Sequence, residues 1–238
     1  MDTTIKIDNE NLANYVMFKL NKSGNKFTQE ELNEIFEIVI DYRDEDDSSF
    51  VFLEELRKFN NLKSITLRYG FIHDDNYNIF SCLKNLSEIV FDNCKFEDAD
   101  LIASLNINAL SLINCDIRSY DFIDSFDDLR ELTIVSGNVK FSKINNLNKL
   151  RYLQLSYSNI INLFDNSILN IDSIEELYID NTNINDFSFL NNMSKLKKVS
   201  IDAKQYENNK KIFNNLIKKN ILVYNEDMVL FGSEDLDD

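Results

Sequence analysis

Proline and tryptophan are absent from the 238-residue chain, which has only 4 glycines and 1 histidine. Average composition would give about 17 glycines and about 12 prolines at this length. The glycines are too widely separated to form a glycine-rich phosphate-binding loop. The single histidine, His73, excludes metal sites that need two histidine ligands. Any acid–base catalysis would therefore depend on carboxylates, lysine or tyrosine.

Basic residues are also in short supply, with 25 against 41 acidic residues and a formal charge of −16. Proteins that bind nucleic acids or acidic membranes directly need the opposite balance, so we expect neither partner. The sequence has no apolar run near 18 residues, and no signal-peptide core follows Met1. The 3 cysteines are an odd number, which favours free thiols. We expect a cytoplasmic protein, or a secreted one if a leader has been removed.

The apolar residues recur in a frame with apolar side chains at positions 1, 4, 6 and 11 and a small residue at position 9. One copy is Leu62, Ile65, Leu67, Gly70 and Ile72. Later copies begin 24, 21, 22, 21, 24 and 22 residues apart. The seven copies begin at Leu62, Leu86, Ile107, Leu129, Leu150, Ile174 and Leu196. Seven matches in register indicate a repeat architecture.

Positions 4 and 6 of the frame alternate, as residues on one face of a short strand do. Between the frames, apolar residues recur at every third position, as in Phe141, Ile144 and Leu147. That spacing favours a short helix or 3₁₀ turn packed on the core. One such unit cannot bury its own apolar face, but stacked units can. The pattern therefore predicts a solenoid.

Residues 50–202 resemble the leucine-rich-repeat family, specifically the short bacterial repeats found in internalins. The resemblance implies an α/β solenoid: a right-handed superhelix with a parallel concave sheet and short helices or 3₁₀ turns on the convex side. The family usually has asparagine at position 9, where it forms a hydrogen-bonded ladder. We expect a looser ladder here, because position 9 holds Gly70, Cys94, Cys115, Gly137, Ser158 and Thr182.

The remaining residues predict caps for the two ends of one continuous domain. Residues 1–55 form the N-terminal cap, with helices over 9–21 and 28–40. About seven repeats occupy 56–202. Residues 203–238 form the C-terminal cap, with a helix over 205–219, strands over 221–224 and 228–231, and an acidic tail.

The predicted concave face has no carboxylate pair or nucleophile–base pair that would indicate catalysis, and the chain has no cofactor motif. It does present several tyrosines, which are frequent at protein-binding hot spots. The first hypothesis is a non-enzymatic scaffold that binds an unidentified protein through this face. Its candidate residues are Ile113, Val135, Tyr152, Gln154, Tyr157 and Tyr178.

An alternative hypothesis rests on the N-terminal cap, where residues 1–55 carry 14 acidic and 5 basic side chains. Such a surface could occupy a basic groove in a nucleic-acid-handling protein, as immunity, anti-phage or anti-CRISPR inhibitors do. The candidate patch is Asp41, Asp44, Glu45, Asp46 and Asp47. We expect a monomer, and a dimer through an exposed terminal strand is the other possibility.

Overall fold

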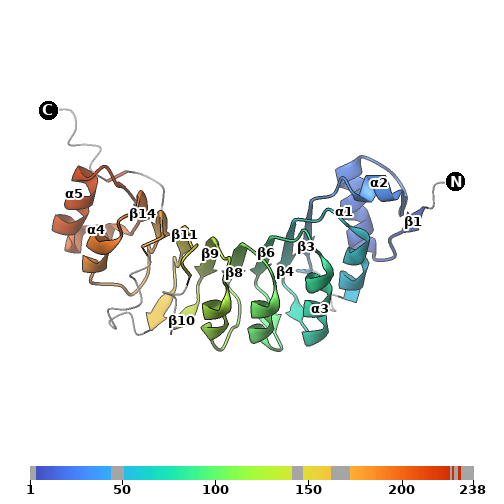
Figure 1. Ribbon diagram of the computed structural model, residues 1–238, viewed down its shortest axis with the longest axis horizontal. Coiled ribbons are helices and arrows are strands. Elements are labelled where there is room, and N and C mark those ends of the chain that lie inside the picture. Colours follow the sequence, from blue (N-terminus) through green and yellow to red (C-terminus); the bar gives the residue numbers. More distant parts are fainter. Residues whose placement is uncertain are drawn as a thin grey trace. The chain divides into compact units, whose positions relative to one another are not determined.

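The computed structural model describes residues 4–43, 51–140, 147–161, 172–225, 227 and 230–231. The chain divides into two compact units, Met1–Ile117 and Arg118–Asp238. Figure 1 shows both units, coloured from blue at the N-terminus to red at the C-terminus. Each unit pairs short parallel strands with short helices, as a repeat of strand and helical turn requires.

The first unit opens with a helical cap. Helix α1 spans Glu10–Leu20, and the Asn9 side chain caps it by accepting a 2.9 Å hydrogen bond from the Leu12 amide. Strand β1 (Ile5–Lys6) pairs antiparallel with β2 (Lys26–Phe27). Helix α2 spans only Gln29–Leu32 and begins with a capping box between Thr28 and Glu31. The box satisfies amides that the first helical turn leaves without partners.

The predicted helix over 28–40 is wrong beyond Leu32, because strand β3 occupies Glu37–Asp41. This strand pairs with β4 (Ser64–Arg68) in parallel register, which places Ile38 opposite Ile65 and Ile40 opposite Leu67. Both isoleucines are buried. Burial of alternate residues against a neighbouring strand therefore prevailed over the helical spacing, and β3 forms an extra repeat strand ahead of the seven predicted copies.

Four parallel strands form the sheet of the first unit, in the order β3, β4, β6 and β8. Strand β6 spans Glu88–Asp92 and β8 spans Ala109–Ile113. A second, two-stranded pairing joins β5 (Phe71–Ile72) to β7 (Lys95–Phe96). The helical turns are η1 (Val51–Lys58), α3 (Asp74–Cys82) and η2 (Ala99–Ser104).

Five parallel strands form the sheet of the second unit, in the order β9, β11, β13, β14 and β15. They span Glu131–Val135, Tyr152–Gln154, Glu176–Tyr178, Lys198–Ser200 and Leu222–Tyr224. Strand β10 (Asn138–Lys140) pairs separately with β12 (Asn159–Ile161). The 3₁₀ turns are η3 (Asp121–Ser125) and η5 (Ser188–Asn192).

The C-terminal cap follows β14. The predicted helix over 205–219 is present as two helices, α4 (Ala203–Asn208) and α5 (Lys210–Lys218). The predicted strand over 221–224 is confirmed as β15. Of the predicted strand over 228–231, residues 228 and 229 lie outside the described residues, and Leu230 makes an isolated antiparallel bridge with Tyr224. The domain boundaries at 55 and 203 stay predictions.

The repeat frame describes the core. Side chains at positions 1, 4 and 6 are buried in all seven copies. Position 8 has a positive φ in the first six copies, which turns the chain out of the strand and brings position 9 inward. These residues are Tyr69, Asn93, Asn114, Ser136, Tyr157 and Asn181. Only small side chains fit the position that follows.

At three of the position 9 residues, Cys94, Cys115 and Ser158, the side chain donates to a carbonyl of the preceding repeat and so forms an interrupted ladder. The Cys94 thiol donates to the Leu67 carbonyl at 3.3 Å, and the Cys115 thiol donates to the Phe91 carbonyl at 3.4 Å. Each acceptor is at frame position 6. Thiols thus take the place of the amide donors of asparagine, and they are weaker donors.

Candidate functional site

Three tyrosines from three strands of the second unit share one face of its sheet with a lysine between two of them. The rings of Tyr152 on β11 and Tyr178 on β13 have their centroids 5.0 Å apart. The ammonium group of Lys198 lies 5.0 Å from the Tyr178 ring centroid and 4.9 Å from that of Tyr224. We call these four residues the tyrosine surface. Cation–π attraction and ring contact hold the side chains in one arrangement.

The phenol groups of this surface also have defined hydrogen bonds. The Tyr152 hydroxyl donates to Gln154 Oε1 at 2.9 Å, and the Tyr178 hydroxyl donates to Glu176 Oε2 at 3.0 Å. Burial raises the pKa of both phenols to about 12. The tyrosines are therefore neutral near pH 7, with their polar ends oriented by neighbours.

A buried hydrogen bond joins the segments that follow β11 and β13. The Ser156 hydroxyl, just beyond β11, donates to Asp180 Oδ1, just beyond β13, at 2.8 Å. Both side chains are buried. A satisfied buried pair of this kind fixes the relative position of neighbouring chain segments. It therefore supports the strand ends next to the tyrosines.

The structure brings together three of the six residues predicted for the concave site. Tyr152, Gln154 and Tyr178 are in contact or on directly paired positions. Val135 is half-exposed at the end of β9, on the outward face of the same sheet. Tyr157 lies beyond β11 and is 57% exposed. Ile113 lies on β8, which belongs to the first unit.

Of the alternative acidic patch, only Asp41 is among the described residues. It ends β3, and its Oδ2 lies 3.5 Å from the Arg43 guanidinium. Its Oδ1 accepts a 3.0 Å hydrogen bond from the Arg43 amide. Asp44, Glu45, Asp46 and Asp47 lie outside the described residues. The acidic patch stays a prediction.

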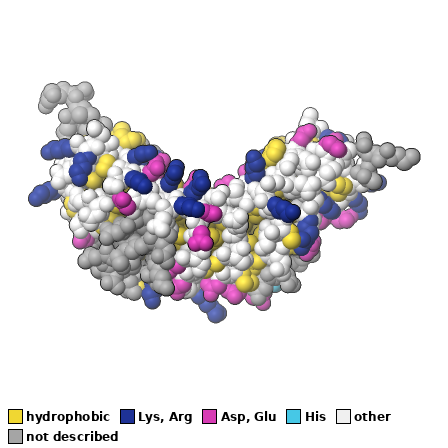
Figure 2. Space-filling model, viewed as in Figure 1, with side chains coloured by type: hydrophobic (Ala, Val, Ile, Leu, Met, Phe, Trp, Pro, Cys, Tyr) yellow, Lys and Arg dark blue, Asp and Glu magenta, His cyan; other side chains and the backbone are white. Residues whose placement is uncertain are grey.

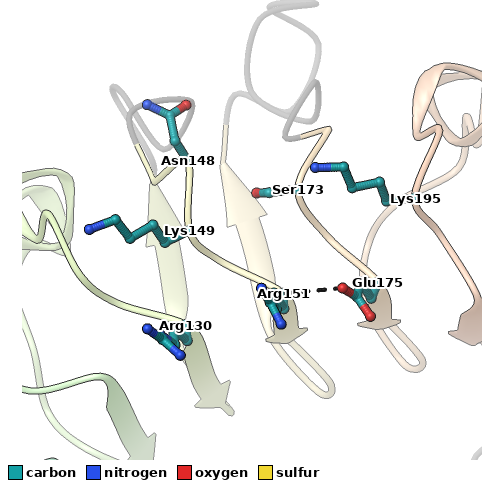
Figure 3. A pocket seen from close by; sticks show the side chains of 7 residues that line it. All are labelled: Arg130, Asn148, Lys149, Arg151, Ser173, Glu175 and Lys195. Carbon is teal, nitrogen blue, oxygen red and sulfur yellow. Dashed lines mark ion pairs between the residues drawn. The ribbon is translucent and has the colours of Figure 1, made fainter.

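A cleft of about 320 Å³ lies where the chain enters the strands of the second unit. Figure 3 shows Arg151 and Glu175 facing each other across its middle, with Arg130 and Lys149 on one side and Lys195 on the other. Arg151 Nε and Glu175 Oε1 are 3.9 Å apart. The lining residues are Arg130, Asn148, Lys149, Arg151, Ser173, Glu175 and Lys195, and we call this site the basic cleft.

Two solved structures from Listeria monocytogenes resemble the chain. Internalin C2 superposes with a TM-score of 0.62 over 87% of this chain and 93% of its own, at 19% identity. InlP superposes with a TM-score of 0.53 over 82% of this chain and 64% of its own, at 13% identity. The chain has an internalin-like leucine-rich-repeat fold. No protein-family model matches its sequence, and no curated protein does.

This leucine-rich-repeat chain has functional candidates that the sequence reasoning missed. Glu176 and Lys198 occupy frame position 3, the same position as Tyr152. The predicted site includes only Tyr152 from that position, although counting along the repeat frame identifies the other two as well. Tyr224 lies on β15, outside the repeat frame, and its place beside Lys198 follows only from the pairing of β15 with β14.

Two further findings concern the described part of this leucine-rich-repeat chain. No group of three or more histidine, cysteine or carboxylate side chains is placed there to hold a metal ion. None of the helices described there is both long and apolar enough to cross a membrane.

Proposed function

We propose that the chain is a non-enzymatic scaffold that binds a partner protein through the tyrosine surface of its second unit. The internalin-like fold supports a role in protein binding in general. The observation that carries the specific proposal is the contact of Tyr152 with Tyr178 and the placement of Lys198 over Tyr178 and Tyr224. Tyrosine is enriched among residues that dominate binding energy, and Lys198 holds two of the rings in place by cation–π attraction.

The tyrosine surface is organised before any partner arrives. Tyr152 and Tyr178 each donate a hydrogen bond to a side chain two residues away on the same face. A partner would therefore meet side chains whose rotamers are already restricted. Binding to such a surface loses less conformational entropy than binding to mobile side chains.

The ionisable groups around this surface have structural roles, which favours recognition over catalysis. Glu176 accepts the Tyr178 hydroxyl, and buried Asp180 accepts the Ser156 hydroxyl. A general base needs a lone pair directed at a substrate proton. Glu176 and Asp180 instead direct lone pairs at hydroxyl groups of the protein itself.

Tyr157 supports a functional use of the neighbouring turn. Its φ is 59°, in the left-handed region, where bulky side chains are uncommon. Equivalent positions in three other repeats hold Asn93, Asn114 and Asn181, which tolerate that conformation better. A strained, 57% exposed tyrosine just beyond β11, the strand that carries Tyr152, is a further candidate binding residue.

The proposal is tested by affinity capture from the source lysate with matched baits. One bait carries Tyr152→Ala with Tyr178→Ala. The control carries Tyr15→Ala with Tyr69→Ala, which removes two tyrosine side chains from the first unit instead. Each bait is first checked by circular dichroism and thermal unfolding. We expect a protein captured by the wild type and the control to be lost from the Tyr152/Tyr178 bait.

A further bait, with Asp44, Asp46 and Asp47 changed to asparagine, tests the acidic-inhibitor alternative. If this bait alone loses a nucleic-acid-handling protein, the alternative replaces the proposal. If a folded Tyr152/Tyr178 bait keeps every partner of the wild type, the tyrosine surface is not the binding site.

A further inference from the structure

Cations gather at the edge of the second unit where the chain enters its strands. Frame position 2 holds Arg130, Arg151, Glu175 and Lys197 in successive repeats. The backbone makes these residues neighbours, because the Arg151 amide donates to the Arg130 carbonyl at 2.8 Å and the Glu175 amide donates to the Arg151 carbonyl at 2.8 Å. Figure 2 shows lysine and arginine side chains gathered over this part of the unit.

A second row lies one residue before each frame and adds further positive charge. It holds Asp128, Lys149, Ser173 and Lys195. In the first unit the equivalent two rows carry a single cation, Lys63. The other equivalent residues there are Asn61, Asn85, Ser87, Asn106 and Asn108. The concentration of cations is therefore a property of the second unit.

Carboxylates neutralise only part of the positive charge in the basic cleft. Glu175 is shared between Arg151 and Lys197, whose ammonium nitrogen lies 2.5 Å from Glu175 Oε2. Lys149 pairs with Asp128 at the margin. Among the described residues, neither Arg130 nor Lys195 has a carboxylate within 4.0 Å. Like charges on adjacent strands repel one another, so an anion bound between them would offset that repulsion.

We propose that the basic cleft binds an extended acidic segment of a partner protein through the carboxylates of its aspartate or glutamate side chains. From β9 to β14 the cleft crosses three strand spacings, about 14 Å in total. That length matches about four residues of extended peptide, and alternate side chains of such a peptide point to one side. A single free phosphate cannot reach both Arg130 and Lys195.

A long polyanion fits this site less well than a short acidic segment. The chain carries a formal charge of −16, so its overall field opposes nucleic acid. A peptide of a few residues needs only the local field of the basic cleft. The inference does not depend on the tyrosine surface, because no residue of that surface lines the cleft.

The test measures fluorescence polarisation of a labelled glutamate peptide of about six residues, long enough to cross the cleft. A glutamine peptide of the same length is the matched probe. The cleft variant is Arg130→Glu with Lys195→Glu, since neither residue forms an ion pair within the described part of the chain. The control variant is Lys204→Glu with Lys211→Glu, which changes net charge equally at exposed positions of α4 and α5.

We expect the wild type and the control variant to bind the glutamate peptide, and the cleft variant to bind it about tenfold or more weakly. Binding should weaken when ionic strength rises to about 150 mM, because exposed charges are screened. Equal losses in the two variants would overturn the proposal, since only net charge would then matter. It would equally fail if the glutamine peptide bound as well, or if wild type bound neither peptide.

Inorganic phosphate and a single-stranded oligonucleotide serve as competitors in the same assay. We expect phosphate to compete only at concentrations where it acts as a screening salt, and the oligonucleotide to compete poorly. Saturable displacement by micromolar phosphate, or tighter binding of the oligonucleotide than of the peptide, would assign the cleft to a different ligand and contradict the proposal.

Discussion

The side-chain amide of Gln205 donates to the carbonyl oxygen of Ile179 at 3.1 Å, and this bond continues the repeat ladder into the C-terminal cap. The same amide nitrogen lies 3.1 Å from Thr182 Oγ1. In three earlier repeats the corresponding carbonyl, at position 6, accepts from the position 9 side chain of the following repeat. Position 9 of the seventh copy is Lys204, which is exposed. Gln205, the next residue on α4, is buried and supplies the donor instead.

We predict that Gln205→Leu lowers the free energy of unfolding by about 1–3 kcal/mol. The substitution introduces an apolar side chain of similar volume. It removes this donor from the Ile179 carbonyl, which keeps the Thr182 hydroxyl, and it removes the capping-box acceptor of the Asp202 amide. Urea denaturation followed by circular dichroism measures the change. Asn208→Leu, at an exposed position of the same helix, is the control and should change stability by less than about 0.5 kcal/mol. Equal effects would show that the ladder bond contributes nothing specific.

Gly137 occupies position 9 without any side chain, and the space around it explains why. A Cβ at this position would lie 2.7 Å from the Tyr120 hydroxyl oxygen and 2.8 Å from Ile134 Cγ2. Both side chains are buried. We predict that Gly137→Ala lowers the free energy of unfolding by about 1–3 kcal/mol through overpacking.

A double-mutant cycle tests the stated cause. Tyr120→Phe removes the atom closest to the added methyl group, so the Gly137→Ala cost should be smaller in that background than in the wild type. Chemical denaturation of the four proteins gives the coupling energy. Strict additivity would mean that the hydroxyl is not the source of the strain.

The thiols should fall into two classes of reactivity. Cys94 is buried and Cys115 is largely so, and burial raises their pKa to about 11 and about 12. Cys82 is exposed. We predict that one thiol reacts quickly with Ellman's reagent in the native protein and that the other two react only after unfolding. Cys82→Ser should abolish the fast phase, and a fast phase that persisted would contradict the assignment.

The same pKa values predict a loss of stability at alkaline pH. The unfolded thiols have a pKa of 9.0, so above that value the unfolded state releases protons that the folded state keeps. The stability that the two buried, protonated thiols contribute is complete below pH 9 and is lost as pH rises toward 11–12. Near pH 10 the loss should be about 1 kcal/mol per thiol. Cys94→Ser with Cys115→Ser should flatten the dependence in reducing buffer between pH 8 and pH 10.

The sequence alone predicted the repeat register well, because alternation along a strand buries positions 4 and 6, and position 1 is buried in the same register just before the strand. It failed over 37–41, because Leu32, Ile35, Phe36 and Val39 have the spacing of a helix face, whereas pairing with β4 makes this segment a strand. It also missed Tyr224, which lies in a strand without the frame. The basic cleft has no burial signal in the sequence, because residues at frame position 2 and just before each frame are mostly exposed, and only the pairing of the strands brings them together.

Tyr157 carries the last prediction, which separates stability from binding at one residue. Its φ of 59° should be better tolerated by asparagine, as at Asn93 and Asn181. Among the described residues its ring forms no aromatic or cation–π contact. Tyr157→Asn should therefore raise the free energy of unfolding by about 1 kcal/mol.

The same variant should weaken capture of a partner that binds at the tyrosine surface, because the exposed ring is lost. Tyr69→Asn is the matched control: its φ is 58°, but its ring lies 4.6 Å from the Arg43 guanidinium. Losing that cation–π contact should offset much of the relieved strain. A Tyr157→Asn protein that is less stable, or that is more stable and binds as the wild type does, would show that this tyrosine is not retained for recognition.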